Sequence, residues 1–257
     1  MPRSVAPVRW RLGVASMHPA RQFDHMDKHR GGAAPRGARL AAEVTRTAAP
    51  ASRAPTRRKP VAERRQAILQ AALGLFSRFG LHGTSVDQVA AEAGISKSNL
   101  LYYFATKEEL YVCVLRDLLD AWLAPLREVS AEQDPQRSIA DYIRAKLVFS
   151  RDSPEASRLF CLEIVQGAPL LRDELDRELH DLVNEKSAVI QAWVDAGHLA
   201  PVDPRHLLFM LWATTQHYAD FAVQVQALTG QTLANPEFFE RTVASVQAMV
   251  LRGVAVR

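Results

Sequence analysis

The sequence predicts an all-α protein in which a small helix-turn-helix unit precedes a larger helical domain. Apolar residues recur with a helical period through most of the chain from about residue 61 onward. Ser, Thr, Asp or Asn residues stand repeatedly where such a periodic stretch begins, as helix N-caps do. No alternating apolar run bounded by turn residues indicates a sheet. Together these patterns indicate about nine helices.

Residues 1–58 differ in composition from the rest of the chain. They are rich in Ala, Arg, Pro and Gly and show no sustained period, so we expect a disordered basic extension. The first 60 residues hold 13 of the 32 Lys and Arg and 3 of the 28 Asp and Glu, which leaves a net charge of −6 on the remainder. The cluster Arg57-Arg58-Lys59 is either a DNA-contacting arm or a solvated tail. Because the residues after 60 carry a net negative charge, a prediction that they bind DNA must depend on local sequence pattern.

Residues 59–106 contain the predicted helix-turn-helix unit. After a first amphipathic helix, Thr84 or Ser85 caps a short second helix with an i, i+3, i+4, i+7 apolar stripe. Gly94 follows that helix, where a left-handed residue is easiest to place, and Ser96 caps a third helix whose first residues are polar. In such a unit the N-terminal residues of the last helix enter the major groove of DNA. The pattern therefore predicts a DNA-binding domain.

Residues 107–257 form the predicted second domain. Thr106 caps a long helix that runs to about Pro125 and connects the two domains. Later helix starts are marked by pairs in which Pro takes a first-turn position: Asp134-Pro135, Ser153-Pro154, Asp203-Pro204 and Asn235-Pro236. The last two helices, at about 204–227 and 236–252, present apolar faces suited to a two-fold four-helix interface. We therefore expect a homodimer.

The sequence lacks targeting signals and reactive cysteine motifs. No apolar run reaches the roughly 18 residues that a membrane-spanning helix needs. No apolar segment follows the N-terminal arginines, as it would in a signal peptide. Cys113 and Cys161 lie far apart and outside any CxxC pattern, so we expect buried or inert thiols in a reducing compartment. These features predict a cytoplasmic protein without a membrane partner.

Catalytic and metal-binding motifs are missing from the sequence. It has no nucleophile elbow, no Gly-rich phosphate loop and no HExxH or CxxC pattern. Two pairs at i, i+3 spacing, Asp203 with His206 and His217 with Asp220, are more typical of a helix cap or a surface pair than of metal ligands. We therefore predict that the protein is not an enzyme and uses no metal and no cofactor, only an effector ligand.

The helix-turn-helix region resembles a known family. The segments that carry the resemblance are Gly80-Leu81-His82-Gly83-Thr84-Ser85, Gly94-Ile95-Ser96, Tyr102-Tyr103-Phe104 and Lys107-Glu108-Glu109-Leu110. Four such elements, in this order and at this spacing, resemble the TetR family of bacterial one-component repressors. The resemblance implies a DNA-binding domain at residues 59–106, an all-helical effector and dimerisation domain at 107–257, and a homodimer on palindromic double-stranded operator DNA.

Segments beyond the DNA-binding unit resemble one branch of that family, the RutR-type repressors of pyrimidine utilisation. The segments are Ser98-Asn99-Leu100-Leu101-Tyr102-Tyr103-Phe104, Trp122-Leu123-Ala124-Pro125-Leu126, Ala156-Ser157-Arg158-Leu159-Phe160-Cys161, Gly167-Ala168-Pro169-Leu170-Leu171 and Trp212-Ala213-Thr214-Thr215-Gln216-His217-Tyr218-Ala219-Asp220-Phe221. In that branch the effector is uracil or thymine, and its binding releases DNA. The resemblance therefore implies a repressor of pyrimidine catabolism genes.

The candidate base-reading residues lie at the start of the third helix. Lys97 and Asn99 have side chains that pair with guanine and adenine edges respectively, and Ser98 lies between them. Of the adjacent Tyr102 and Tyr103, we expect one to pack inward and one to offer its hydroxyl to a phosphate. The resemblance places the phosphate contact on Tyr102.

Candidate phosphate contacts gather at two other helix starts. Thr84 and Ser85 offer a hydroxyl and free backbone N–H groups, although plain N-capping explains them equally well. Lys107 lies in the first turn of its helix, where a cation opposes the helix dipole and a phosphate partner would explain it. The full set of expected DNA-binding residues is Thr84, Ser85, Ser96, Lys97, Ser98, Asn99, Tyr102, Tyr103 and Lys107.

Two tryptophans and a glutamine form the candidate effector site. Trp212 and Gln216 are four residues apart and share a helix face, and Trp122 on the connecting helix supplies a second aromatic wall. A planar ring stacks on an indole, and a Gln amide matches the C=O and N–H groups of a uracil edge in two hydrogen bonds. Without the resemblance, core packing is the more usual role of such tryptophans. The resemblance favours an effector site, with Leu119 and Phe160 as apolar lining.

Three other functions compete with this interpretation. The first is a repressor of the same family that responds to a different small molecule, and Gln216 argues mildly against a lipid. The second is a protein that coats DNA through its basic extension, with no dependence on operator sequence or ligand. The third is an enzyme acting on pyrimidines, which the missing motifs disfavour.

Overall fold

The computed structural model describes residues 61–256, and every regular element in this range is helical. The all-α prediction is confirmed. The predicted extension at 1–58, with its Arg57-Arg58-Lys59 cluster, lies outside the described residues. Within them, none of the helices combines the length and the apolar character that crossing a membrane requires.

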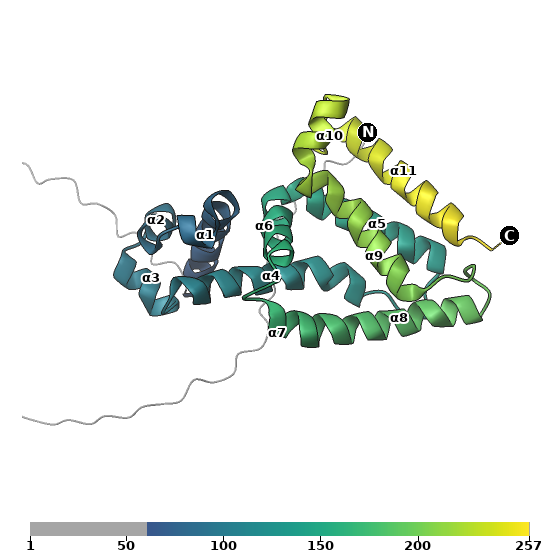
Figure 1. The fold of residues 1–257 in the computed structure, drawn as a ribbon, viewed down its shortest axis with the longest axis horizontal. Helices are drawn as coiled ribbons and strands as arrows, with labels where there is room; N and C mark the ends of the chain where they lie inside the picture. Colours follow the sequence, from purple (N-terminus) through teal and green to yellow (C-terminus); the bar gives the residue numbers. More distant parts are fainter. Residues whose placement is uncertain (1–60, 257) are drawn as a thin grey trace, which may run out of the picture. The chain divides into compact units, whose positions relative to one another are not determined.

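Most of the helices begin at the caps that the sequence indicates, and Figure 1 shows their arrangement. Their bounds are α1 Val61–Gly83, α2 Val86–Glu92, α3 Lys97–Tyr103, α4 Lys107–Arg127, α5 Pro135–Asp152, α6 Pro154–Val165, α7 Arg172–Glu174, α8 His180–Asp195, α9 Pro204–Asp220, α10 Ala222–Thr229 and α11 Pro236–Val254. A π-helical stretch, Leu175–Leu179, joins α7 directly to α8. The helix predicted at 204–227 is divided into α9 and α10 because the backbone leaves the helical conformation at Phe221.

The helix-turn-helix unit is held by local side-chain caps. Ser85 accepts a hydrogen bond from the backbone of Gln88, whose side chain accepts one in return from the Ser85 backbone, which makes a capping box. Ser96 caps α3 in the same way through Asn99 N. Gly94 has φ of +67°, so it supplies the left-handed turn that the sequence predicts between the two helices.

Helix α1 attaches the helix-turn-helix unit to the rest of the described chain. It packs against α2, α4 and α6, and its backbone is broken near the end by Gly80, which has φ of +67°. Phe76 of α1 and Phe104 after α3 are both fully buried. The recognition unit is therefore packed through α1 on the N-terminal half of α4.

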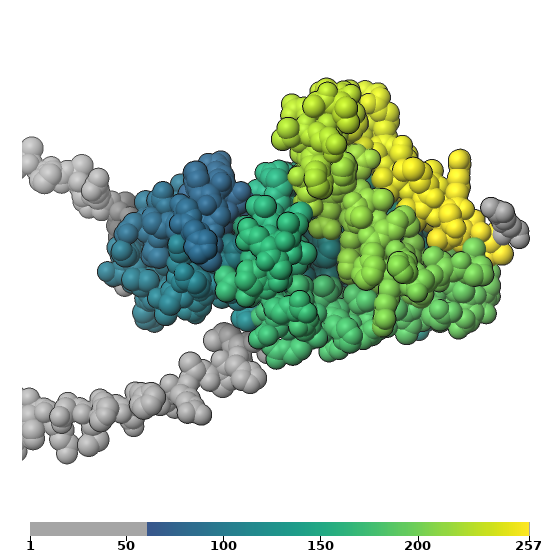
Figure 2. Space-filling view, viewed as in Figure 1, coloured from purple at the N-terminus to yellow at the C-terminus, as the bar shows by residue number. Residues whose placement is uncertain are grey.

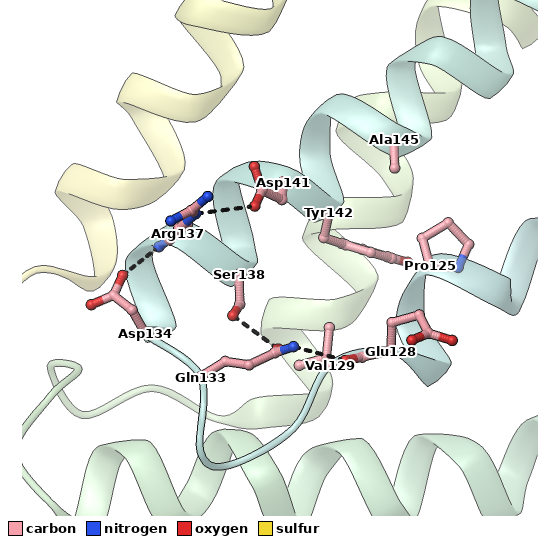
Figure 3. Close-up of a pocket in the computed structure, with 10 residues that line it drawn as sticks. All are labelled: Pro125, Glu128, Val129, Gln133, Asp134, Arg137, Ser138, Asp141, Tyr142 and Ala145. Atoms are coloured by element: carbon pink, nitrogen blue, oxygen red, sulfur yellow. Dashed lines mark hydrogen bonds and ion pairs between the residues drawn. The ribbon is translucent and has the colours of Figure 1, made fainter.

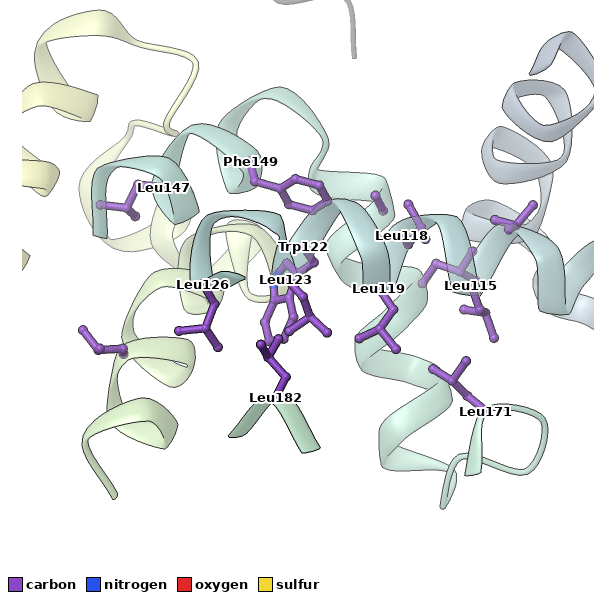
Figure 4. Packing of buried hydrophobic residues seen from close by; sticks show 14 of the residues in the cluster. Leu115, Leu118, Leu119, Trp122, Leu123, Leu126, Leu147, Phe149, Leu171 and Leu182 are labelled. Atoms are coloured by element: carbon purple, nitrogen blue, oxygen red, sulfur yellow. The ribbon is translucent and has the colours of Figure 1, made fainter. Parts of the chain in front are cut away.

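Helix α4 forms the centre of the hydrophobic core. Leu115, Leu119, Leu123 and Leu126 are almost completely buried along it (Figure 4). The helix contacts α1 at one end and α5, α6 and α8 further along. Because α4 packs on both α1 and the C-terminal helices, a change in its position reaches both parts of the fold.

Helices α9, α10 and α11 carry an exposed apolar surface. The helices lie next to one another in the space-filling view (Figure 2), and α9 contacts both of the others. The exposed apolar side chains on these helices and at the break between α9 and α10 include Phe209, Met210, Phe221, Val223, Leu228 and Met249. Large exposed apolar patches usually mark an interaction surface. This surface suits the predicted homodimer, which stays a prediction.

Candidate functional site

The N-terminal end of α3 presents a polar surface. Lys97 and Ser98 are exposed and Asn99 is half-buried. Ser96 is also exposed, and its hydroxyl is occupied as a cap because it accepts the backbone N–H of Asn99 at 3.2 Å. The first turn of a recognition helix is the part that reaches base edges. The structure therefore brings these four residues together at a suitable surface, and their contacts with DNA stay a prediction.

Lys97 has a partner on the neighbouring helix. Its Nζ donates to Asp87 Oδ2 of α2 at 2.9 Å, and both side chains are more than half exposed. An exposed ion pair of this kind contributes at most about 1 kcal/mol. A DNA phosphate or base can therefore replace Asp87 at small cost in free energy.

The two adjacent tyrosines point in different directions, as expected. Tyr102 is 82% exposed, whereas Tyr103 is half-buried and packs against the core. Their rings meet edge to face with centroids 5.5 Å apart. The inward tyrosine thus supports the exposed one, whose hydroxyl is free to reach a phosphate.

In the turn before α2, the Thr84 hydroxyl does not have the expected role, and Lys107 makes an additional hydrogen bond. Ser85 is the N-cap, whereas Thr84 is 2% exposed and its hydroxyl donates to Gly80 O at 2.9 Å. A phosphate contact from the Thr84 hydroxyl is therefore not supported, because that group is buried and already bonded. Lys107 Nζ donates to Thr84 O at 3.0 Å. This bond ties the start of α4 to the turn, so Lys107 has a structural partner that explains its position without DNA.

Three aromatic rings from three helices meet at the candidate effector site. The Trp122 ring of α4 lies 5.3 Å from that of Trp212 in α9 and 5.5 Å from that of Phe160 in α6, between centroids. Trp212 Nε1 donates to Tyr142 Oη at 2.8 Å. The polar atom of Trp212 is therefore satisfied within the protein, and its ring also packs on Phe209 with centroids 5.9 Å apart.

Gln216 lies on the same face of α9 as Trp212 and Asp220, since the three follow at intervals of four residues. Gln216 is half-buried, and its amide makes no hydrogen bond within the part of the chain that the structure describes. Asp220 accepts a hydrogen bond of 2.6 Å from Ser157 Oγ and a second hydrogen bond from the Cys161 thiol. Burial raises the pKa of Asp220 above its usual value, and these hydrogen bonds oppose that shift.

Leu119 does not join this cluster. Its side chain is 2% exposed and borders a separate groove of about 260 Å³ together with Arg116, Asp173 and Glu174. Although Leu119 lies only three positions before Trp122 on α4, it faces the α7 side of the fold. The assignment of Leu119 to the effector site is therefore not supported.

Lys146 of α5 was not identified from the sequence, yet it lies against Trp122 of the aromatic cluster. It is 1% exposed, and its Nζ lies 3.1 Å from the centroid of the Trp122 ring. Burial lowers the pKa of Lys146 well below the ordinary value of 10.5, with Asp220 opposing the shift. One signal was present: Lys146 interrupts the apolar stripe formed by Ile139 and Ile143.

A larger groove lies beside this cluster, between the end of α4 and the start of α5. It has a volume of about 540 Å³ and is lined by charged and polar residues, by Tyr142 and by the apolar Pro125, Val129 and Ala145 (Figure 3). Arg137 and Asp141 form an ion pair on its rim at 3.7 Å. The groove does not include Trp122 or Gln216. Tyr142 connects the groove to the cluster, because its hydroxyl accepts the hydrogen bond from Trp212.

The remaining candidate groups behave as structural residues. Asp203 caps α9 by accepting hydrogen bonds from the backbone of Arg205 and His206, as predicted. His217 stacks on Phe221 with centroids 5.1 Å apart, and Asp220 faces inward, so they do not form the expected surface pair. Burial raises the pKa of the Cys113 and Cys161 thiols, which agrees with their predicted inertness. Among the described residues, no group of three His, Cys, Asp or Glu is placed to hold a metal ion.

Comparisons with known proteins cover both parts of the chain. Residues 68–113 match the family described as bacterial regulatory proteins, tetR family, and residues 115–257 match the family described as YcdC-like protein, C-terminal region. The HTH-type transcriptional regulator RutR of Escherichia coli strain K12 is 55% identical over 201 residues, which are 78% of this chain and 95% of that protein.

Solved structures show the same fold. A TetR-like transcriptional regulator from Rhodococcus sp. RHA1 superposes with a TM-score of 0.56 at 21% identity, covering 76% of this chain and 98% of that one. A TetR family regulator from Pseudomonas syringae pv. tomato DC3000 gives a TM-score of 0.53 at 23% identity, covering 77% and 100% respectively.

Proposed function

The chain belongs to the TetR family of bacterial regulatory proteins, and from this premise we propose that it represses pyrimidine catabolism genes and leaves operator DNA when uracil or thymine binds. Regulators of this family bind operator DNA and small-molecule effectors, typically as dimers. They are not enzymes, which confirms the sequence-based prediction on that point.

One observation carries the choice of effector: the rings of Trp122 in α4 and Trp212 in α9 lie 5.3 Å apart between centroids, and Gln216 lies one turn after Trp212 on the same face of α9. Two indole rings suit a planar heterocycle, and the Gln216 amide offers both a donor and an acceptor to its edge. The similarity to RutR over nearly its whole length supports the same assignment.

The DNA-binding half of the proposal depends on α3. Lys97, Ser98 and Asn99 are the base-reading candidates, and the exposed Tyr102 is the phosphate candidate. In a two-fold dimer the two copies of α3 would enter successive major grooves about 34 Å apart. A palindromic operator is the expected target.

Helix α4 provides the connection between the two sites. It carries Trp122 in its C-terminal half and begins at Lys107, directly after the recognition unit. An effector that binds more tightly to the conformation unsuited to DNA would release the operator.

Calorimetric titration of the purified protein with uracil, thymine, cytosine and adenine tests the effector. We expect uracil or thymine to bind, and Gln216→Leu to weaken that binding about tenfold or more through the loss of hydrogen bonds to the ligand. Gln136→Leu, the same change at an exposed position of α5, is the matched control. Thermal melts establish that both variants are folded.

Release of DNA is measured separately, by fluorescence anisotropy with a duplex that the protein selects from a random pool. Uracil or thymine should raise the dissociation constant for this duplex. Specific DNA binding without a response to any of the four bases would point to a different small molecule. Binding that ignores DNA sequence would favour the coating protein instead.

A further inference from the structure

The side chain of Lys146 is buried without a hydrogen-bonding partner. Its Nζ is enclosed and makes no hydrogen bond within the described residues. The contact that it does make is with the face of Trp122, 3.1 Å from the ring centroid. A cation–π contact offsets part of the cost of removing an amine from water, but a buried donor without an acceptor still opposes folding.

A second buried lysine shows what a structural role looks like in this fold. Lys186 is 4% exposed, and its Nζ donates to Arg127 O at 2.9 Å and to Val129 O at 3.0 Å. It also pairs with Glu185 at 2.7 Å. All three donors of Lys186 thus have acceptors, whereas Lys146 has none. The contrast indicates that the amine of Lys146 has a role other than stabilising the fold.

We propose that Lys146 is an effector-contacting residue, which covers the stacking face of Trp122 until a planar ring displaces it and then donates a hydrogen bond to a carbonyl oxygen of that ring. This inference rests on the proposed function. The position of Nζ supports displacement, because a ring stacked on Trp122 at the usual spacing of about 3.5 Å needs the same space.

The flexible stem of lysine allows this movement. Its four carbons let Nζ swing from the face of Trp122 to the edge of a stacked ring while the side chain remains in the same cluster. Asp220, the carboxylate whose charge acts on Lys146, lies on the face of α9 that also carries Gln216. Lys146 and Gln216 would then hold different parts of the ring edge.

The chemistry of the amine restricts the ligand class. In its protonated form, which a carbonyl oxygen of the effector would stabilise, it has three donors and no acceptor, so its partner on the effector must be an oxygen or another acceptor. If a ring presented an amino group at that edge, two donors would face each other, the amine of Lys146 and the amino group of the ring. Neither would have an acceptor, so such a ring would be rejected. Lys146 thus favours oxo-pyrimidines over rings with an amino group at the same position.

The test compares Lys146→Met with Lys186→Met in the full chain, using uracil as the probe. Met matches the volume of Lys without its amine, so it should fill the space beside Trp122. For Lys146→Met we expect a melting temperature no lower than that of the wild type and a uracil dissociation constant raised about tenfold to a hundredfold. For Lys186→Met we expect the reverse, a lower melting temperature and an unchanged dissociation constant.

The outcomes separate this inference from the proposed function. Equal uracil binding by the wild type and Lys146→Met would overturn the role of Lys146 and leave the pyrimidine sensor intact. A loss of stability in Lys146→Met as large as in Lys186→Met would also overturn it, because the amine would then serve folding. A wild-type chain that binds no pyrimidine would overturn the proposed function and this inference together.

Discussion

Tyr111 and Glu163, 52 residues apart in the sequence, share a buried hydrogen bond in which Tyr111 Oη donates to Glu163 Oε2 at 3.2 Å. The other carboxylate oxygen accepts the backbone N–H of Leu170 at 2.8 Å. Tyr111 also packs edge to face on Phe76 of α1, with centroids 5.0 Å apart. The pair therefore joins α6 and its following turn to the segment of α4 that holds the recognition unit.

Replacing Tyr111 with Phe should lower the free energy of unfolding by about 1–3 kcal/mol, because the buried carboxylate of Glu163 loses a donor. Burial raises the pKa of Tyr111 above its ordinary value of 10.0, with Glu163 adding to the shift, so the phenol remains a donor at neutral pH. Urea denaturation measures the change. Tyr102→Phe, at an exposed position, should leave stability unchanged.

A double-mutant cycle isolates the contribution of the Glu163 charge to this bond. In a Glu163→Gln background the Tyr111→Phe change should cost less, because the charged acceptor is gone. The same cost in both backgrounds would show that the charge of Glu163 adds nothing to the hydrogen bond.

Replacing Gly94 with Ala should destabilise the protein by about 1–2 kcal/mol, since the left-handed backbone strains any residue with a Cβ. Its φ is +67°, and an added Cβ would have no atom within 4 Å, so the cost comes from the backbone alone. Gly74→Ala is the matched control. Gly74 lies within α1 with equally open space, and Ala there should stabilise the helix by about 0.5–1 kcal/mol. Opposite signs in urea denaturation are the expected result.

Replacing Tyr102 with Phe should weaken binding to the selected operator duplex about tenfold without changing the melting temperature, because a charge-assisted hydrogen bond to phosphate is lost. Tyr103→Phe should have a smaller effect on DNA affinity, since that ring is half-buried. Fluorescence anisotropy at one fixed salt concentration gives both values. An unchanged DNA affinity of Tyr102→Phe would show that the Tyr102 hydroxyl does not contact a phosphate.

The pH dependence of stability should report the buried Lys146. Its pKa in the folded chain is lowered below 10.5, so the unfolded chain binds a proton more readily than the folded one. The free energy of unfolding of the wild type, relative to Lys146→Met, should therefore rise with pH between the lowered folded value and 10.5. Asp220 opposes the shift and narrows that window. Parallel pH profiles for the two proteins would show that the amine does not titrate with folding.

Local features of the fold were predictable because they depend on neighbouring residues. Ser85, Ser96 and Thr106 all cap helices, since each hydroxyl meets a backbone N–H only three residues away. The turn at Gly94 follows from the same kind of local chemistry. These signals established the helix-turn-helix unit without any knowledge of packing.

Features that depend on packing between distant helices were not predictable. Leu119 and Trp122 are three residues apart on α4, yet they face different neighbours, and only the positions of α7 and α9 decide which. Lys146 meets Trp122 because α5 lies against α4. The break at Phe221 likewise carries no Gly or Pro to announce it.

Pro125 gives α4 the properties of a lever. Lys186 fixes the carbonyls of Arg127 and Val129 at the C-terminal end of the helix, and Pro125 lies just before this anchor. Pro125 donates no hydrogen bond to the carbonyl of Ala121, so bending is easiest in the turn between these two residues, which contains Trp122. At 1.5 Å per residue, Lys107 lies about 22 Å from Trp122 along the helix. A change of about 8° in the bend of this turn would therefore move the start of α4, where the helix-turn-helix unit is attached, by about 3 Å.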